Sequence, residues 1–432
     1  MKVSRPARIR ATIHVPPDKS ISHRALIFNA IATGRATVEH ILDSDDVRST
    51  ARCLAALGVP IDWPEGAAVA HVTGQGLHGL FEAEDVLDCG NSGTTMRLLL
   101  GLLAGHPILS VLTGDRSLRS RPMARVIQPL RTMGAHLAAR RGDTLAPVVI
   151  KGGSLRGIAY QSPVASAQVK SAILLAGLYA EGETAVSEPS RSRDHTERLL
   201  TAMGAPLTSD GLTVRVRPAD RLSAVSVRVP GDISSAAPWM VLGVCHPDAE
   251  IVLEGVNVNP TRTGILDILR AMGADLELVE ERTSGGEPVA DIVVRSSQLR
   301  ATSVGGELVP RAIDELPLVA LAACFAEGTT VVRDAAELRV KESDRVRTVV
   351  EALGRLGAAI REREDGFEVD GPVRLRGARV HAHGDHRIGM LGAIAGCLAE
   401  GETEVLDDAV GVSYRAFWDD LRAATSGEAM AR

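Results

Sequence analysis

The sequence predicts an α/β protein built from six copies of a unit of about 72 residues. Two interleaved phrases lead to this prediction. An apolar helix that closes near a glycine and leads into a Thr/Val-rich strand occurs six times, and the phrase Leu-x-x-[Met/Leu]-Gly occurs five times. Regular spacing of such phrases is the signature of a repeat architecture, and six units account for all 432 residues.

The six apolar helices are expected at intervals of 68 to 80 residues, each opening with a polar or charged cluster. They begin near Ser20, Ser92, Ser166, Ser234, Asp314 and Asp385. Ser, Asn and Asp are good N-caps, so capping explains each polar start taken alone. Helix N-termini also carry partial positive charge, and basic residues lie beside several of these starts. We therefore expect the set as a whole to bind anions.

The second phrase ends five further helices at a glycine, with spacings of 76, 70, 69 and 84 residues. The glycines are Gly58, Gly134, Gly204, Gly273 and Gly357. Helices commonly end on a left-handed residue, so each glycine is expected to have a positive φ and to precede a short strand. The unit therefore reads strand, helix, strand, helix, strand, strand.

The composition excludes several classes of protein. Hydrophobic residues make up 45% and charged residues 24%, and no apolar run approaches the ~20 residues of a membrane span. A net charge of −6 with 3% aromatic residues disfavours nucleic-acid binding. The five scattered cysteines are typical of buried thiols in a reducing compartment. No signal-peptide pattern opens the chain, so a cytoplasmic location is expected.

Two isolated motifs have simple structural explanations. Gly74–Gly79 matches the GxGxxG string of dinucleotide-binding folds, but no long helix is expected after it. We expect a turn that closes a strand. Cys89 has no His or Lys nearby in the sequence, so a buried thiol is favoured over a nucleophile.

Two clusters of histidine or basic residues also have ordinary structural explanations. His381, His383 and His386 fall within six residues, but without a suitably spaced Cys or Glu a structural role is favoured, and no metal site is expected. Lys341 and Arg345 are interpreted as lying on one face of a helix start, where solvated ion pairs are the ordinary explanation.

Seven strings in the chain nevertheless form a recognisable set. They are Asp18–Arg24, Gly90–Arg97, Leu112–Arg116 with Ser120–Pro122, Ser166–Lys170, Ile313–Pro317, Arg339–Arg345 and Gly384–Arg387. Together they resemble the 5-enolpyruvylshikimate-3-phosphate synthase (3-phosphoshikimate 1-carboxyvinyltransferase) family of the enolpyruvyl transferases. The strings occur in the family's order and cover nearly the whole chain.

The resemblance implies a two-domain, inside-out α/β barrel of the enolpyruvyl transferase type, with three βαβαββ repeats in each domain. It implies a discontinuous first domain at residues 1–17 and 238–432 and a second domain at 18–237. The active site is expected in the cleft between them, which closes on substrate. Family membership also implies a monomer.

The reaction implied is transfer of the carboxyvinyl group of phosphoenolpyruvate to the 5-hydroxyl of shikimate 3-phosphate, with release of phosphate. It belongs to the shikimate pathway to chorismate and the aromatic amino acids. Addition and elimination through a tetrahedral intermediate need a base for the hydroxyl, an acid for the methylene carbon and no cofactor. Both substrates carry a phosphate and a carboxylate, which explains the internal cations of an acidic protein.

Site residues also follow from the resemblance. Asp314 with Lys341 would act at the hydroxyl, Glu342 and Lys19 at C3 of phosphoenolpyruvate, and His386 at the departing phosphate. The set implied for shikimate 3-phosphate is Lys19, Ser20, Arg24, Ser166, Ala167, Gln168, Arg193, Asp314 and Lys341. The set implied for phosphoenolpyruvate is Lys19, Asn91, Gly93, Arg121, Gln168, Arg345 and Arg387.

The chain departs from the family pattern at two places. Pro17 stands where many members have Gly, which would stiffen the crossover between domains. Many members also carry a Lys near the C-terminus, whereas this chain reads Val412–Ala416, where Arg415 is expected to supply a charge.

Other strings are similar to the family's second class, whose known members often tolerate the inhibitor glyphosate. These are Ser166–Lys170, Arg193–Glu197 and Asn259–Arg262. Tolerance in that class goes with Ala at the position of Gly93. We therefore expect glyphosate to inhibit this enzyme in competition with phosphoenolpyruvate.

Two alternatives stay open on the sequence alone. An enolpyruvyl transferase acting on UDP-N-acetylglucosamine usually has a Cys in its mobile loop, and Asp115–Pro122 contains none. A non-catalytic binder of small anions on the same fold would be favoured by loss of Asp314, Lys341 or Glu342, and all three are present.

Overall fold

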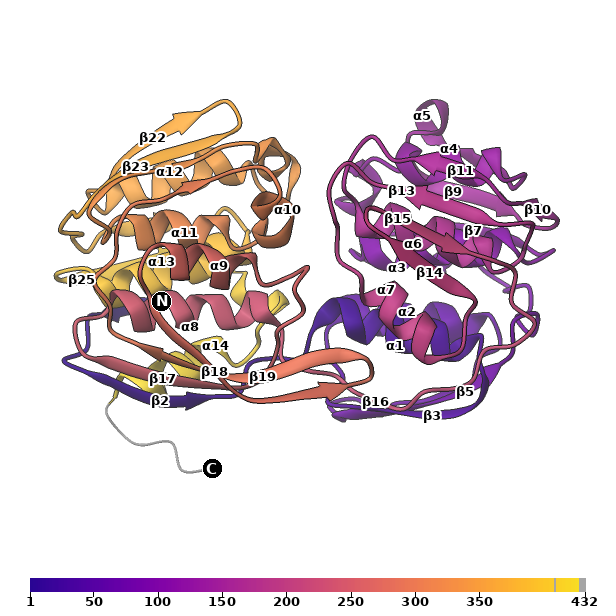
Figure 1. Cartoon of the computed structure of the whole chain (residues 1–432), viewed down its shortest axis with the longest axis horizontal. Helices are drawn as coiled ribbons and strands as arrows, with labels where there is room; N and C mark the ends of the chain where they lie inside the picture. Colours follow the sequence, from indigo (N-terminus) through magenta and orange to yellow (C-terminus); the bar gives the residue numbers. More distant parts are fainter. Residues whose placement is uncertain (408, 427–432) are drawn as a thin grey trace. The chain divides into compact units, whose positions relative to one another are not determined.

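The computed structural model describes residues 1–407 and 409–426. The chain forms two compact units (Figure 1). Unit 1 comprises Met1–Pro16, Pro230–Arg282 and the chain from Pro288 onward, and unit 2 comprises Pro17–Val229 and Thr283–Glu287. The division expected from the resemblance, 18–237 against the rest, stays a prediction. Pro238, at its second boundary, lies inside helix α8 (Ile233–Cys245).

Unit 2 contains the first helices of the chain and four small sheets. Its helices are α1 (Lys19–Ala30), α2 (Asp45–Ala56), α3 (Gly93–Ala104), η1 (Leu118–Ser120), α4 (Ala124–Thr132), α5 (Arg140–Asp143), α6 (Ala167–Gly177) and α7 (His195–Ala202). Its strands are β3 (Thr33–Glu39), β4 (Ile61–Asp62), β5 (Val69–Gln75), β6 (Leu87–Asp88), β7 (Leu109–Thr113), β8 (His136–Ala139), β9 (Leu145–Lys151), β10 (Leu155–Arg156), β11 (Ala159–Gln161), β12 (Ala180–Glu181), β13 (Thr184–Ser187), β14 (Leu207–Asp210), β15 (Thr213–Val216) and β16 (Val227–Arg228).

Unit 1 holds the remaining elements. Its helices after α8 are α9 (Gly264–Ala271), α10 (Leu308–Ala312), α11 (Leu316–Ala323), η2 (Ala336–Val340), α12 (Arg345–Arg355), α13 (His386–Leu398), η3 (Val410–Val412) and α14 (Phe417–Thr425). Its strands are β1 (Lys2–Ser4), β2 (Ile9–Ile13), β17 (Ala249–Asn257), β18 (Asp275–Ser284), β19 (Glu287–Arg295), β20 (Ser303–Val304), β21 (Gly328–Val332), β22 (Ala359–Arg363), β23 (Gly366–Gly371), β24 (Arg379–His381) and β25 (Glu402–Leu406). The tip of the β18–β19 turn, Thr283–Glu287, groups with unit 2.

The four-stranded sheets share one pairing pattern. In the order β16-β3-β5-β4, the first pair is parallel and the next two are antiparallel. The sheets β6-β7-β9-β8, β11-β13-β15-β14 and β20-β21-β23-β22 follow the same rule. Strand β2 likewise runs parallel to β17 at the edge of the sheet β18-β19-β17-β2. Within the described residues these sheets stay separate and no strand pairing joins them, so the inside-out α/β barrel implied by the resemblance stays a prediction.

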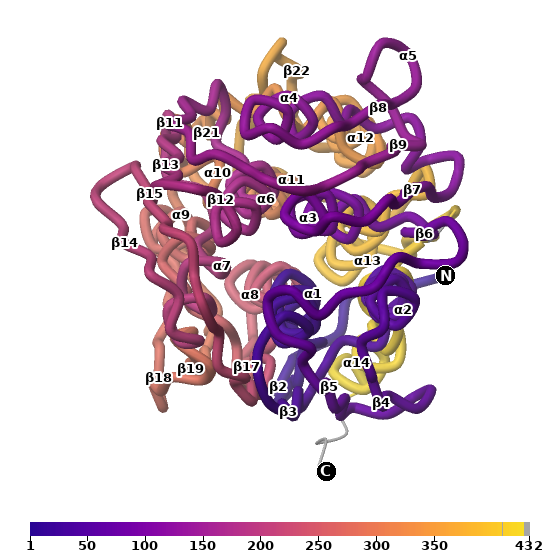
Figure 2. The backbone as a smooth tube through the Cα atoms, turned by 90° about the vertical axis from the view of Figure 1, so that its right-hand side faces the viewer, coloured from indigo at the N-terminus to yellow at the C-terminus, as the bar shows by residue number. Residues whose placement is uncertain are grey.

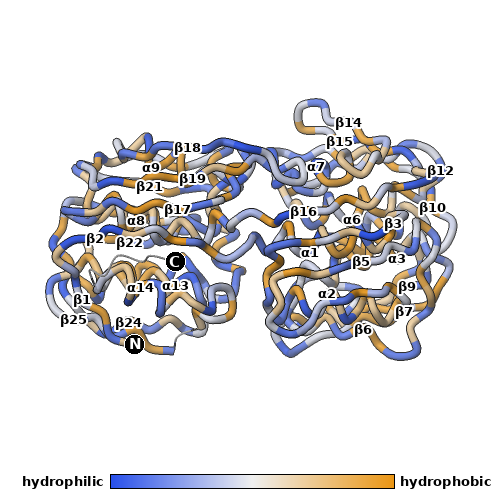
Figure 3. The backbone as a smooth tube through the Cα atoms, turned by 90° about the horizontal axis from the view of Figure 1, so that it is seen from below, coloured by the Kyte–Doolittle hydropathy of each residue, from blue (hydrophilic) through white to orange (hydrophobic). Residues whose placement is uncertain are grey.

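Two kinds of helix fill each unit. The apolar helices are almost wholly buried, and α3 and α6 pack side by side (Figures 1 and 2). Gly101 allows that approach, because a Cβ at this position would lie 2.3 Å from the Ala172 carbonyl oxygen. The other helices are amphipathic and cover the outside. Each unit consequently has its own hydrophobic core, and hydrophobic and hydrophilic stretches alternate along the chain in both (Figure 3).

The five predicted helix-ending glycines are confirmed. Their φ angles are 87° at Gly58, 111° at Gly134, 86° at Gly204, 90° at Gly273 and 91° at Gly357. They follow α2, α4, α7, α9 and α12, and in each case a strand begins shortly afterwards. Because an L side chain is strained in this region, glycine is the residue that ends these helices at low cost.

Several motif interpretations can now be judged. Gly74–Gly79 closes strand β5 with a turn, as expected. The helix start predicted at Lys341 is wrong: α12 begins at Arg345, because the Asp344 side chain accepts from the Arg347 N–H at 3.2 Å and caps the helix there. No helix in the described part of the chain is long and apolar enough to span a bilayer.

Candidate active site

In unit 2, the first turn of α1 brings two predicted residues together. Asp18 caps the helix through its own carboxylate, which accepts from the Ile21 N–H at 2.9 Å. Lys19 and Ser20 follow directly, half-buried. The Lys19 ammonium lies 3.1 Å from Asp46 Oδ2 on α2, and this cation holds the pKa of Asp46 below its ordinary value although burial acts to raise it. Asp46 therefore orients Lys19.

Arg24 lies one turn further along α1 and is 3% exposed. Its guanidinium donates to Thr196 Oγ1 at 2.8 Å, to Ser171 Oγ at 2.9 Å and to the Ser20 carbonyl at 3.1 Å. In the described chain no carboxylate forms an ion pair with it, and burial lowers its pKa to about 10. A buried guanidinium held only by neutral groups is prepared for an anion that comes from solution.

The start of α3 forms a second group. The Arg121 guanidinium donates to Asn91 Oδ1 at 2.6 Å and to Ser117 Oγ at 3.3 Å, while Asn91 donates to Asp115 Oδ2 at 2.6 Å. Gly93 is the first residue of α3, and a Cβ there would lie 2.8 Å from Nη1 of Arg97. Asn91, Gly93 and Arg121 of the predicted phosphoenolpyruvate set therefore lie together.

The start of α6 is built differently. Ser166 occupies the N-cap position, yet its side chain makes no capping bond, so the capping explanation fails at this helix. Its backbone N–H donates instead to Glu188 Oε1 at 3.1 Å. Ala167 is the first helical residue, and Gln168 accepts from the Arg97 guanidinium and donates to Thr94 Oγ1 at 2.9 Å. Arg193 lies half-buried just before α7.

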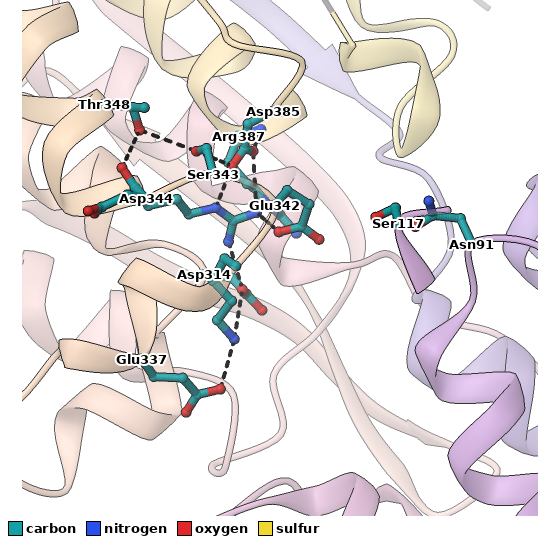
Figure 4. A network of polar contacts seen from close by, with 12 residues as sticks. Asn91, Ser117, Asp314, Glu337, Glu342, Ser343, Asp344, Thr348, Asp385 and Arg387 are labelled. Carbon is teal, nitrogen blue, oxygen red and sulfur yellow. Dashed lines mark hydrogen bonds and ion pairs between the residues drawn. The ribbon is translucent and has the colours of Figure 1, made fainter. Parts of the chain in front are cut away.

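In unit 1, Arg345 is the centre of an ionic cluster. Its guanidinium contacts Asp314 at 3.1 Å, Glu342 at 2.6 Å and Asp385 at 2.9 Å, and Figure 4 shows these carboxylates converging. Burial alone favours a neutral guanidinium, but Glu342 and the other two carboxylates raise the pKa of Arg345 above its ordinary value. Arg345 is therefore charged, and internal carboxylates neutralise it.

Two carboxylates of this cluster, Glu342 and Asp385, have lowered pKa values and are ionised at neutral pH. Burial by itself raises the pKa of Glu342, but the electrostatic effect of Arg345 and His386 brings that pKa below its ordinary value. Arg345 likewise outweighs burial and lowers the pKa of Asp385, which is fully buried and caps α13 through the Arg387 N–H at 2.9 Å. Glu342 can therefore accept a proton, whereas donation requires that it first be protonated.

Asp314 and Lys341 lie close together, as the sequence led us to expect. Lys341 Nζ is 4.0 Å from Asp314 Oδ1 and 3.0 Å from Glu337 Oε1. The ammonium is about one-fifth exposed, because Lys341 lies in the extended segment before α12 rather than on a helix. Lys341 thus has a second carboxylate that the sequence analysis did not identify.

His386 and Arg387 occupy the first turn of α13. His386 is buried, and Arg387 donates through Nη1 to the Ser234 carbonyl at 2.8 Å. The Ser234 hydroxyl donates to Glu315 and accepts from Arg262 Nη2 at 2.7 Å. The starts of α8, α11 and α13 therefore meet in unit 1 through these side chains.

The groups that hold the predicted residues were not predicted from the sequence. Asp46 orients Lys19, Thr196 and Ser171 hold Arg24, and Glu188 holds Ser166. The only signal was that Ser171 directly follows Ser166–Lys170 and that Thr196 lies within Arg193–Glu197. The sequence does not show which residue Ser171 or Thr196 contacts.

The remaining candidates, Cys89, His381 and His383, have contacts that are typical of structural residues. Cys89 is buried, and a hydrogen bond with Cys53 together with burial raises its pKa well above 9.0, which disfavours the nucleophilic thiolate. His381 pairs with Asp407 and His383 with Glu351. Among the described residues no group of three or more His, Cys, Asp or Glu side chains is arranged to hold a metal ion.

The chain is similar to known proteins over almost its whole length. Residues 3–421 match the family described as EPSP synthase (3-phosphoshikimate 1-carboxyvinyltransferase). The chain is 57% identical over 416 residues to a 3-phosphoshikimate 1-carboxyvinyltransferase of Gloeobacter violaceus, covering 96% of both chains. It is 54% identical over 422 residues to the protein of that name from Roseiflexus castenholzii, covering 96% of this chain and 97% of the relative.

The fold has a close counterpart among solved structures. The chain superposes on an EPSP synthase from Acinetobacter baumannii with a TM-score of 0.90 and 42% sequence identity, covering 98% of each chain. The similarity therefore extends over both units.

Proposed function

The chain belongs to the EPSP synthase family, and on that basis we propose how its residues carry out the family reaction. The protein transfers the enolpyruvyl group of phosphoenolpyruvate to shikimate 3-phosphate in the shikimate pathway. It is a 3-phosphoshikimate 1-carboxyvinyltransferase (EC 2.5.1.19). The observation that carries this conclusion is 57% identity to such an enzyme over 96% of both chains.

We assign most of the proton transfer to residues of unit 1, and one donor, Lys19, to unit 2. Asp314, with Lys341 4.0 Å away, takes the proton of the 5-hydroxyl while the hydroxyl oxygen forms a bond to C2 and C3 accepts a proton. Elimination then removes one proton from C3 and breaks the bond between C2 and the phosphate oxygen. The ionised Glu342 accepts that C3 proton, Lys19 is the proposed donor in the addition, and His386 assists the departing phosphate.

The proposal assigns most anion binding to unit 2. Shikimate 3-phosphate is held by Lys19, Ser20, Arg24, Ser166, Ala167, Gln168 and Arg193, with Asp314 and Lys341 of unit 1. Phosphoenolpyruvate is held by Lys19, Asn91, Gly93, Arg121 and Gln168, with Arg345 and Arg387 of unit 1. The support for Arg24 is its burial without a carboxylate partner in the described chain. Arg345 already contacts three carboxylates, so phosphoenolpyruvate would have to compete with them.

One assay tests the function against the two alternatives. Phosphate release from phosphoenolpyruvate is measured with shikimate 3-phosphate, with UDP-N-acetylglucosamine and with no acceptor. We expect release with shikimate 3-phosphate alone. Release only with the UDP-sugar would identify the sister transferase, and release with neither acceptor would leave a small-anion binder.

The finer architectural and cellular statements are also proposals. The shared pairing pattern of the small sheets supports six copies of one βαβαββ unit. We propose a cytoplasmic monomer that binds neither nucleic acid nor membranes, as the composition and the family suggest. Sedimentation of the purified protein tests the monomer.

A further inference from the structure

A buried ion cluster lies beneath the shikimate 3-phosphate residues of unit 2. The Lys170 ammonium on α6 is 2.8 Å from Glu188 Oε2 and 2.7 Å from Glu197 Oε1 on α7. The three side chains are exposed by only 3%, 3% and 8%. Charges that are buried to this extent are tolerated only when they are paired and hydrogen-bonded. The burial of each of these three side chains therefore depends on the other two.

Glu188 is the member that joins two separate segments. Its Oε1 accepts from the Ser166 N–H at 3.1 Å, where α6 begins. Its Oε2 accepts from Ser192 Oγ at 2.9 Å, one residue before Arg193. The Glu188 carboxylate thereby connects the segments that contain Ser166 and Arg193, to which we assigned ligand binding. Its negative charge strengthens both hydrogen bonds.

Lys170 supplies the charge that allows this carboxylate to stay buried. Burial favours the neutral amine, but Glu197 and Glu188 outweigh it and raise the pKa of Lys170. Burial also raises the pKa of Glu197. Glu188 accepts from the Ser166 N–H and from the Ser192 hydroxyl while it contacts the Lys170 ammonium.

The same helices also hold Arg24. Ser171 follows Lys170 on α6, Thr196 precedes Glu197 on α7, and the two hydroxyls contact the Arg24 guanidinium at 2.9 and 2.8 Å. The ion cluster thus fixes α6 and α7 relative to each other while the hydroxyls beside it position Arg24. Glu197, the carboxylate that acts most strongly on Arg24, is paired with Lys170 instead.

We propose that Glu188, with Lys170 as its counter-ion, is a positioning residue for shikimate 3-phosphate. It holds Ser166 and Ser192, the residue before Arg193, in place before the substrate arrives, so less ordering is needed on binding. The inference rests on the proposed function, because that function assigns both residues to this substrate. Glu188 touches no reacting atom, so its effect is confined to acceptor binding.

The test is the variant Glu188→Gln in the full-length protein. Gln keeps the shape but loses the charge and can accept through only one oxygen. We expect the KM and the calorimetric Kd for shikimate 3-phosphate to rise about tenfold, the loss expected for one or two charged hydrogen bonds. The KM for phosphoenolpyruvate and kcat should stay within about twofold, since the donors around Arg121 are untouched.

Two further variants separate positioning from general destabilisation. Glu183→Gln is the matched control and should change no constant. Glu183 precedes strand β13, which Glu188 follows, and its ion-pair partners among the described residues are the exposed Arg215 and Arg217. Ser192→Ala removes only the hydroxyl donor on the Arg193 side, and we expect about a threefold rise in the KM for shikimate 3-phosphate. This variant provides the test if Glu188→Gln fails to fold.

Specific outcomes would overturn the inference. An unchanged KM for shikimate 3-phosphate in both Glu188→Gln and Ser192→Ala would do so, as would an equal rise in the KM for phosphoenolpyruvate. A lower melting temperature with unchanged affinities would show a purely structural role. Absence of phosphate release by the unmodified enzyme would instead refute the proposed function, and this inference with it.

Discussion

Two buried arginines, one in each unit, are held in opposite ways. Arg345 in unit 1 contacts the carboxylates of Asp314, Glu342 and Asp385. Arg24 in unit 2 contacts two hydroxyls and one carbonyl oxygen, and no carboxylate forms an ion pair with it in the described chain. The pKa of Arg345 is raised above its ordinary value by its partners, whereas burial lowers that of Arg24 to about 10.

The difference separates two uses of a buried cation. The charge of Arg345 holds three carboxylates in place, so it supports the fold and the groups to which we assign proton transfer. Among the described residues no carboxylate forms an ion pair with Arg24, which agrees with its proposed role in binding an anion from solution. The same residue type therefore stabilises the fold in one unit and is proposed to bind substrate in the other.

The largest expected effect comes from Arg345→Met. The change leaves Asp385, which is fully buried, beside Asp314 and Glu342 without their shared cation. We expect a loss of about 3 kcal/mol or more in the free energy of unfolding, together with loss of activity. Urea unfolding checks this, with Arg355→Met as the control because Arg355 forms only an exposed pair with Glu351. Equal unfolding midpoints for the two variants would contradict the assignment.

Arg24→Met should give the reverse pattern. The free energy of unfolding is expected to change by less than about 1 kcal/mol, because the cation removed is buried and forms no ion pair with any described residue. The KM for shikimate 3-phosphate should rise about a hundredfold, equivalent to about 3 kcal/mol. The exposed Arg35→Met serves as control, and both quantities are measured on each protein. A destabilisation as large as that of Arg345→Met would erase the contrast between the units.

Gly93→Ala tests how tightly the group of Asn91, Gly93 and Arg121 at the start of α3 is packed. The new Cβ would lie 2.8 Å from Arg97 Nη1, at the far end of a flexible side chain that also donates to Gln168. We expect stability to be nearly unchanged, while the inhibition constant for glyphosate rises about tenfold. The unmodified enzyme should be inhibited in competition with phosphoenolpyruvate. An inhibition constant already far above the KM for phosphoenolpyruvate in the unmodified enzyme would refute this expectation.

Acid should weaken unit 2 before unit 1. Burial lowers the pKa of His23 on α1 from 6.5 to about 3, so between these values the unfolded chain binds a proton that the folded chain does not. The contribution of His23 to stability is therefore lost as the pH falls from 6.5 towards 3, by at most about 1.4 kcal/mol per pH unit. In unit 1 the lowered pKa of Asp385 keeps its contribution until the pH falls below its unfolded value of 3.8.

Hydrogen exchange at pH 7 and pH 5 distinguishes the two units. Protection factors, which are corrected for the slower intrinsic exchange at acid pH, should fall at pH 5 in peptides from α1 but not in those from α12. His23→Gln should remove this fall in α1, because Gln does not titrate. An equal fall in both helices would show that the acid response is not local to His23.

Local features of the fold were readable from the sequence. Five glycines were predicted to end helices because a left-handed residue is cheapest as glycine, and all five have positive φ. The polar starts of the apolar helices were predicted because unsatisfied N–H groups need nearby acceptors, and Asp18, Ser92 and Asp385 supply them. The start of α12 was misplaced because one capping bond from Asp344 outweighed the helical spacing of Lys341 and Arg345.

Sequence motifs also sufficed to indicate the family, the reaction and the residues that would serve it. Only the tertiary structure decided what surrounds each of those residues. Arg24 and Thr196 are 172 positions apart and Arg345 and Asp385 are 40 apart, and the pairs meet only because separate helices pack together. Capping and glycine conformation depend on neighbours within one turn, whereas the state of a buried charge depends on every group around it. For that reason the sequence could indicate Arg24 and Arg345 as site residues, whereas only the fold showed that Arg345 contacts internal carboxylates and that Arg24 contacts hydroxyl and carbonyl groups.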